Sequence, residues 1–178
     1  LKIFEIVNIN LNETSVKKIV MFPSYMMANL LSHIGVGVLI IGITLSTYYS
    51  SQKEIIMIKG AEVFIQDIKV KFIDVESKLS NNYVSQVGIF DAYKSDDYLI
   101  SFFPEKRTYN IQKNVMTEAA ISSNFFRDIY IALGEKLSND SWVVRIYYKP
   151  FIQLLWYGAA LMILGGLFGI FGRRKLSK

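Results

Sequence analysis

The fold class is decided by an uncharged stretch of 25 residues, Tyr25–Tyr49, with the sequence YMMANLLSHIGVGVLIIGITLSTYY. It lies within a longer segment, residues 19–52, that contains no Asp, Glu, Lys or Arg. A helix needs about 20 apolar residues to cross the hydrocarbon core of a bilayer. We therefore predict a transmembrane helix over residues 25–49.

A second uncharged stretch, Phe151–Gly172 (FIQLLWYGAALMILGGLFGIFG), predicts another transmembrane helix over residues 150–172. The alternative for both stretches is a buried hairpin in the core of a soluble protein, which the length of the charge-free runs disfavours. A cleaved signal peptide fits neither stretch, because the first lacks a compact basic segment before its apolar run and the second is C-terminal. The sequence thus predicts an integral membrane protein with two transmembrane helices flanking a central domain.

Charge predicts the orientation of the two helices. The chain has a net charge of +5, and the two tails, residues 1–24 and 173–178, hold seven basic and two acidic residues, which account for all of it. Basic flanks stay in the cytoplasm, whereas long loops are translocated largely regardless of charge. We therefore expect both termini inside and residues 50–149 in the periplasm or its organellar equivalent. The charged tail residues are Lys2, Glu5, Glu13, Lys17, Lys18, Arg173, Arg174, Lys175 and Lys178.

Composition excludes several kinds of chemistry from this chain. It contains no cysteine, which removes disulfides, thiol redox chemistry and cysteine zinc sites. We expect no nucleic-acid partner, because the positive charge lies in the tails and forms no basic stripe interleaved with aromatic residues. The single histidine lies inside the first apolar stretch, so a Ser-His-Asp set is ruled out; no phosphate loop, carboxylate metal set or dinucleotide fingerprint is present.

Residues 50–149 are predicted to form a mostly β domain, because short runs rich in Ile, Val, Tyr and Phe alternate with turn-forming residues. Residues 124–133 fit either a short helix or a strand closed by Gly134, and residues 142–147 fit a last strand that leads toward the second helix. The polar clusters Pro104–Arg107 and Thr117–Glu118 are interpreted as solvated turns. The other predicted strands are Ile55–Ile58, Glu62–Gln66, Ile68–Ile73, Tyr83–Phe90 and Tyr98–Phe102.

His33 is the candidate functional residue, because an ionisable group at membrane depth is costly. It could be an axial ligand of a cofactor, a proton relay or an interhelical hydrogen-bond partner; the alternative is a histidine that only packs against a neighbouring helix. Gly37, one helical turn later, leaves room for a flat ligand or another helix. In the second stretch, Gly165 and Gly169 form a G-x-x-x-G pattern that predicts close helix packing.

Several segments follow the order and spacing of one known family from about residue 24 to residue 174. They are Ser32–Val36, Tyr49–Glu54, Asn82-Tyr83, Phe103–Tyr109, Met116–Ala119, Asp128–Gly134, Trp142–Phe151 and Gly165-Gly166, with a basic tail. In this pattern the chain resembles the C-terminal part of the CcmF (CycK) family of cytochrome c-type biogenesis proteins, the haem-lyase subunit of the cytochrome c maturation system.

The resemblance implies a place in the inner membrane of a bacterium or a mitochondrion. It implies a role in transferring haem from the haem chaperone CcmE to the Cys-x-x-Cys-His motif of apocytochrome c, with CcmH-type and CcmI-type subunits as partners. It further implies that His33 is one axial ligand of a transmembrane haem b, which would keep the incoming haem iron reduced.

The chain also departs from that family. Members are several times longer, and their tryptophan-rich haem-handling segment, periplasmic histidine pair and second haem b histidine have no counterpart here; Ser32 replaces the usual alanine. We therefore expect the second axial ligand to come from the rest of the CcmF polypeptide or a split N-terminal part, and expect no catalysis by this chain alone. Since residue 1 is Leu, we expect a processed chain or part of a longer one. The missing family segments lead us to expect one piece of a split protein or a truncated remnant. The alternative function is a membrane-anchored scaffold in which His33 only packs helices.

Overall fold

The computed structural model describes residues 24–111 and 113–176, which belong to two compact units. One unit holds most of the two helices, and the other comprises Gly42–Gln153. The predicted N-terminal connection as far as residue 23, and Lys178 at the end of the basic tail, lie outside the described residues.

Two long apolar helices flank a β domain in the sequence, as predicted. Helix α2 spans Ser24–Tyr49 and helix α3 spans Gln153–Leu176. Both are long and apolar enough to cross a membrane. Helix α3 begins three residues later than the predicted boundary at 150, because Pro150 still belongs to a strand and Phe151 has a left-handed backbone with φ of 60°. Its helical backbone continues past residue 172 into the basic tail.

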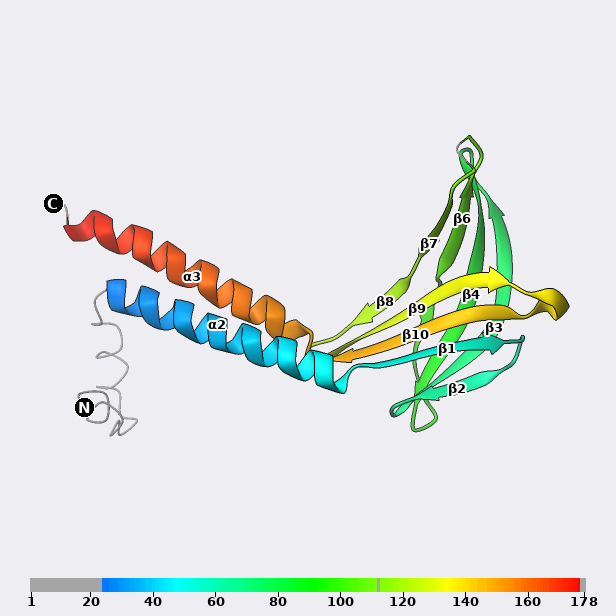
Figure 1. The fold of residues 1–178 in the computed structure, drawn as a ribbon, viewed down its shortest axis with the longest axis horizontal. Helices are drawn as coiled ribbons and strands as arrows, with labels where there is room; N and C mark the ends of the chain where they lie inside the picture. Colours follow the sequence, from blue (N-terminus) through cyan, green and yellow to red (C-terminus); the bar gives the residue numbers. More distant parts are fainter. Residues whose placement is uncertain (1–23, 112, 177–178) are drawn as a thin grey trace. The chain divides into compact units, whose positions relative to one another are not determined.

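The β domain consists of two antiparallel sheets (Figure 1). The four-stranded sheet has, in spatial order, β1 (Ser51–Met57), β10 (Trp142–Pro150), β9 (Arg127–Lys136) and β8 (Ala120–Ser123). The six-stranded sheet has β2 (Glu62–Ile65), β3 (Ile68–Leu79), β4 (Tyr83–Lys94), β6 (Glu105–Tyr109) and β7 (Val115–Glu118), with β5 (Asp97–Phe102) paired to β4. The short 3-10 turn η2 (Ser138–Asp140) lies between β9 and β10.

The core of the β domain lies between these sheets. Strand β3 alternates buried and half-buried residues at its start, as its Ile-Lys-Val-Lys-Phe pattern predicts. At the centre, the rings of Phe72 and Phe90 stack with centroids 4.9 Å apart. Buried residues of the other sheet, including Ile131 and Val144, complete the same cluster. The two sheets are therefore joined by a continuous apolar layer, which holds a domain that has no disulfide.

The sequence left residues 124–133 as either a short helix or a strand that ends at Gly134. Residues 127–133 belong to strand β9, whereas residues 124–126 precede it as a turn, and Gly134 does not end the strand, which continues to Lys136. A Cβ at Gly134 would lie 2.8 Å from the carbonyl oxygen of Val143 on β10, beside the register shift between Trp142 and Val144. The glycine is explained by this close approach of two strands, and not by a strand end.

Candidate functional site

Small residues form the contact between α2 and α3. Gly35 and Gly158 lie opposite each other, so that a Cβ added to either would be 2.7 Å from the carbonyl oxygen of the other. At Gly165, an added Cβ would lie 2.8 Å from the carbonyl oxygen of Ala28 and 2.9 Å from the backbone nitrogen of Ser32. The G-x-x-x-G pattern thus marks a close helix contact, as predicted, and the contact is made within this chain.

His33 does not take part in that contact. The residues of α2 that meet α3 include Ala28, Ser32, Gly35 and Leu39, which share one face of the helix. At about 100° per residue, His33 lies roughly 130° around the helix from the centre of this face. Its side chain is exposed. Within the described residues, His33 therefore lies on the face of α2 that points away from α3.

A hydrogen bond sets the tautomer of the imidazole. The Nδ1 atom of His33 lies 2.7 Å from the carbonyl oxygen of Asn29, one turn earlier on α2. Because a carbonyl oxygen can only accept, Nδ1 must carry the proton, and Nε2 keeps its lone pair when the ring is neutral. The backbone thus orients the ring and leaves Nε2 available to a metal ion or a hydrogen-bond donor.

The space beside His33 is open on the same side of the helix. A Cβ added at Gly37, one turn after His33, would meet nothing within 4 Å in the described chain. Among the described residues, no group of three or more His, Asp or Glu side chains could hold a metal ion. Since the sequence has a single histidine, a second imidazole ligand would have to come from another polypeptide segment. Within the described residues, the site therefore offers one imidazole nitrogen beside open space.

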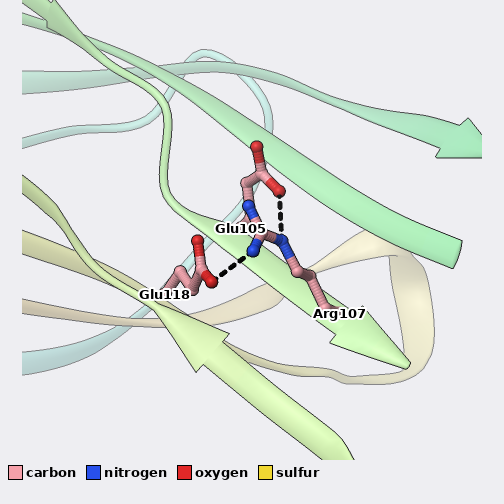
Figure 2. Close-up of polar contacts among 3 residues, drawn as sticks. All are labelled: Glu105, Arg107 and Glu118. Atoms are coloured by element: carbon pink, nitrogen blue, oxygen red, sulfur yellow. Dashed lines mark hydrogen bonds and ion pairs between the residues drawn. The ribbon is translucent and has the colours of Figure 1, made fainter. Parts of the chain in front are cut away.

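A second polar cluster lies in the β domain, where the sequence predicted solvated turns. That prediction is wrong, because both segments are strands: β6 and β7 pair, with Glu105 opposite Glu118. The Arg107 guanidinium donates from Nε to Oε2 of Glu105 at 2.8 Å and from Nη1 to Oε1 of Glu118 (Figure 2). Its other contact is with the ring of Tyr83 on β4, whose centroid lies 4.9 Å from Cζ. One cation therefore connects three strands.

The electrostatics of this cluster are those of a structural clamp. The pKa of Arg107 is raised above its ordinary value, chiefly by the hydrogen bond to Glu105. Charge attraction from Glu105 and Glu118 adds to this effect. The side chains are only partly exposed, which reduces the screening of their attraction by solvent. None of the three residues is a nucleophile poised by a neighbouring base. We assign the cluster to holding β4, β6 and β7 together.

We expect Arg107→Lys to lower the midpoint of thermal unfolding, because an ammonium group cannot reproduce two donors in fixed geometry. Arg107→Ala should lower it further, since the two carboxylates would then face each other without a cation. Circular dichroism of the detergent-solubilised chain measures both. The matched control is Arg145→Ala, which removes a more exposed pair with Glu54 on β1. Equal midpoints for Arg107→Ala and Arg145→Ala would contradict the structural role.

One more polar group, which the sequence did not single out, lies at the start of β9. The carboxylate of Asp128 is buried and accepts hydrogen bonds from Nε2 of Gln153 at 2.9 Å and from the hydroxyl of Tyr130 at 3.1 Å. Burial, followed by the bond to Asp128, raises the pKa of Tyr130. The group ties the first residue of α3 to the sheet. A carboxylate within an apolar strand, Asp-Ile-Tyr-Ile, was the available signal.

The family assignment rests on the sequence of the β domain. Residues 48–150 match the family described as the CcmF C-terminal beta-sandwich. The chain belongs to the CcmF family. This confirms the resemblance seen in the sequence, and the matched segment runs from the last two residues of α2 to the end of β10, which covers every strand of the β domain.

Individual CcmF proteins agree with this assignment. The chain is 39% identical over 144 residues to the cytochrome c-type biogenesis protein CcmF of Pseudomonas aeruginosa, covering 81% of this chain and 22% of that protein. For CcmF of Haemophilus influenzae the identity is 40% over 145 residues, covering 82% and 22%; for CcmF of Escherichia coli it is 40% over 146 residues, covering 80% and 22%. The chain thus spans about a fifth of the length of these curated relatives.

A solved structure described as cytochrome c haem lyase CcmF has the same fold. It aligns with a TM-score of 0.68 at 13% sequence identity, covering 79% of this chain and 24% of that one. This similarity is one of fold.

Proposed function

We propose that this chain is the C-terminal portion of a membrane-bound haem lyase complex that transfers haem from the chaperone CcmE to apocytochrome c. Membership of the CcmF family supports this, as does the haem lyase identity of the similar structure. The remaining part of a CcmF polypeptide, or its split counterpart, would complete the complex, together with CcmH-type and CcmI-type subunits. Because the chain spans about a fifth of its relatives, it is proposed as a component and not as the whole catalyst.

The membrane setting is part of the proposal. Helices α2 and α3 have the length and composition of membrane spans. The basic residues flank them on the side of the chain termini, so we propose that both termini are cytoplasmic and that the β domain lies in the periplasm or the mitochondrial equivalent. The membrane would be the inner membrane.

We further propose that His33 is one axial ligand of a haem b shared with another polypeptide segment. The observation that carries this role is the Nδ1–H hydrogen bond to Asn29, which leaves Nε2 free on an exposed face of α2. Asn29 orients the imidazole through its carbonyl group, and Gly37 leaves open space one turn away. A haem held there would supply one-electron chemistry.

A visible absorption spectrum tests the ligand role. We expect the chain, purified in detergent with its partner subunits, to show a reduced b-type spectrum that His33→Ala abolishes while the partners still co-purify. In His33→Gly, added imidazole should restore the spectrum by replacing the missing side chain. Ser32→Ala is the matched control, since it changes the neighbouring position on the helix contact and should keep the haem.

The opposite result would support the scaffold alternative. If His33→Ala retains the b-type spectrum in the assembled complex, His33 is not an axial ligand. If the wild-type complex with all its partners carries no haem b, the chain is better described as a membrane-anchored scaffold in which His33 packs against a helix of another subunit.

A further inference from the structure

The four-stranded sheet shows which end of the β domain adjoins the two helices. Strand register places Ser51 opposite Tyr148, Tyr148 opposite Ile129 and Ile129 opposite Ser122, in one row across the sheet. Ser51 begins β1 just after α2, and the end of β10 leads into α3. The turn between β8 and β9 therefore lies at the same end of the sheet as both helix junctions.

That turn has a well-defined conformation. The side-chain Oδ1 of Asn124 accepts hydrogen bonds from the backbone nitrogens of Phe126 at 3.0 Å and Arg127 at 2.9 Å. The carbonyl oxygen of Phe126 accepts a bond of 2.7 Å from the backbone nitrogen of Phe151, two residues before α3. The turn is thus fastened directly to the segment that enters the second helix.

Exposed aromatic rings gather at this end of the domain. Phe125 and Phe126 are 67% and 69% exposed, and Tyr48, near the end of α2, is 80% exposed. The rings of Tyr49 and Phe151 contact each other with centroids 6.2 Å apart. We refer to these five residues as the aromatic patch. Two adjacent, largely exposed phenylalanines on a rigid turn are unusual for a surface that meets only water.

The charges beside the turn are compatible with lipid headgroups. The Asp128 carboxylate is buried and satisfied by Gln153 and Tyr130, so it does not project toward an anionic surface. The guanidinium of Arg127 lies over the ring of Tyr148, with Cζ 5.6 Å from the centroid and Nη1 buried, and Nζ of Lys149 lies 5.7 Å from the ring centroid of Tyr130. Aromatic residues accompanied by Arg and Lys are typical of the membrane interface.

We propose that the turn between β8 and β9 enters the interfacial layer of the bilayer, with Phe125 and Phe126 at headgroup level beside the ends of α2 and α3. This inference rests on the proposed membrane insertion of the helices. We assign lipid as the occupant because the turn is hydrogen-bonded to Phe151, two residues before α3, the proposed membrane-spanning helix. The turn would then be a third point of attachment, which restrains rotation of the β domain about its two helix connections.

Spin labels can test this directly, because the chain contains no cysteine and any single cysteine is a unique label site. Nitroxides at Phe126→Cys and, as a second variant, Phe125→Cys would be measured in the full chain in vesicles of phosphatidylethanolamine and phosphatidylglycerol. The control is Leu137→Cys, just after the other end of β9, roughly 30 Å along the strand at about 3.3 Å per residue. Power saturation compares collision with oxygen, which partitions into lipid, and with a water-soluble nickel chelate.

We expect the ratio of oxygen to nickel accessibility to be several-fold higher at positions 125 and 126 than at 137. A further label at Val36→Cys on α2 separates this inference from the membrane proposal. If Val36 reports lipid while 125 and 126 match 137, the turn is in water and the inference is wrong, although the helices are inserted. If Val36 also reports water, both proposals are wrong. Labels at 125 and 126 that are shielded from both reagents would show a protein contact, which also overturns the inference.

Discussion

Phe90→Ala is expected to lower the free energy of unfolding of the β domain by about 3–5 kcal/mol, the usual cost of removing a buried aromatic ring. The side chain of Phe90 is fully buried, and its ring stacks on Phe72 at an interplanar angle of 19°. The space left behind would open at the centre of the apolar layer between the sheets. The loss should exceed that of any surface substitution in this domain.

Denaturant titration followed by tryptophan fluorescence measures this effect, since Trp142 is buried in the same core. The control is Phe64→Ala on β2, where the ring is 59% exposed and the expected change is within about 0.5 kcal/mol. Similar losses for the two variants would show that the layer around Phe90 is not the main source of stability.

Gly165→Leu is expected to separate α2 from α3. Any side chain at this position meets the backbone of α2, at the carbonyl oxygen of Ala28 and the nitrogen of Ser32, and backbone atoms cannot move aside as a flexible side chain can. Because association of helices in a bilayer depends on this close packing, we expect the helix contact to be lost.

A disulfide can report that contact. A Cβ at Gly169 would lie 3.5 Å from the Cβ of Ala28, which is within the range of a disulfide, about 3.5–4.5 Å. In the Ala28→Cys, Gly169→Cys variant we expect efficient oxidation, and adding Gly165→Leu should reduce the yield about tenfold, a free-energy change of about 1.4 kcal/mol. Gly166→Leu is the matched control, since a Cβ there meets nothing within 4 Å and the yield should not change. Equal yields for the two leucine variants would contradict the contact.

Strands that contain an apolar run were predicted from the sequence, whereas strands that lack an apolar run were missed. Residues 68–73 and 83–90 were assigned correctly but ended too early, since β3 and β4 each extend to 12 residues. Strand β6 has the sequence Glu-Lys-Arg-Thr-Tyr, which contains no apolar alternation. It is a strand because it pairs with the first half of β4 on one side and with β7 on the other. Such pairing is a tertiary property, and local propensity does not report it.

In the candidate site, too, some features are visible in the local sequence and others depend on tertiary contacts. The sequence singled out His33, because one ionisable residue within a charge-free run needs no partner to be noticed. The sequence alone could not show on which side of α2 the His33 ring lies relative to α3, because this depends on which helix face is used for packing. Nor could it show the hydrogen bond to Asn29 that leaves Nε2 free. The contacts of Arg107 with Glu105, Glu118 and Tyr83 also required the strand register.

The two apolar helices, the mostly β character of the domain between them and the CcmF resemblance can all be inferred from the amino-acid sequence. These follow from charge-free length, from alternation and from residue order, which are properties of adjacent residues. Three features are visible only in the folded chain: the pairing of β6 with β7, the outward direction of His33, and the position of Phe125 and Phe126 beside the helix junctions. Each of these brings together residues far apart in the chain, and the free energy of packing and hydrogen bonding that selects such contacts is absent from any local pattern.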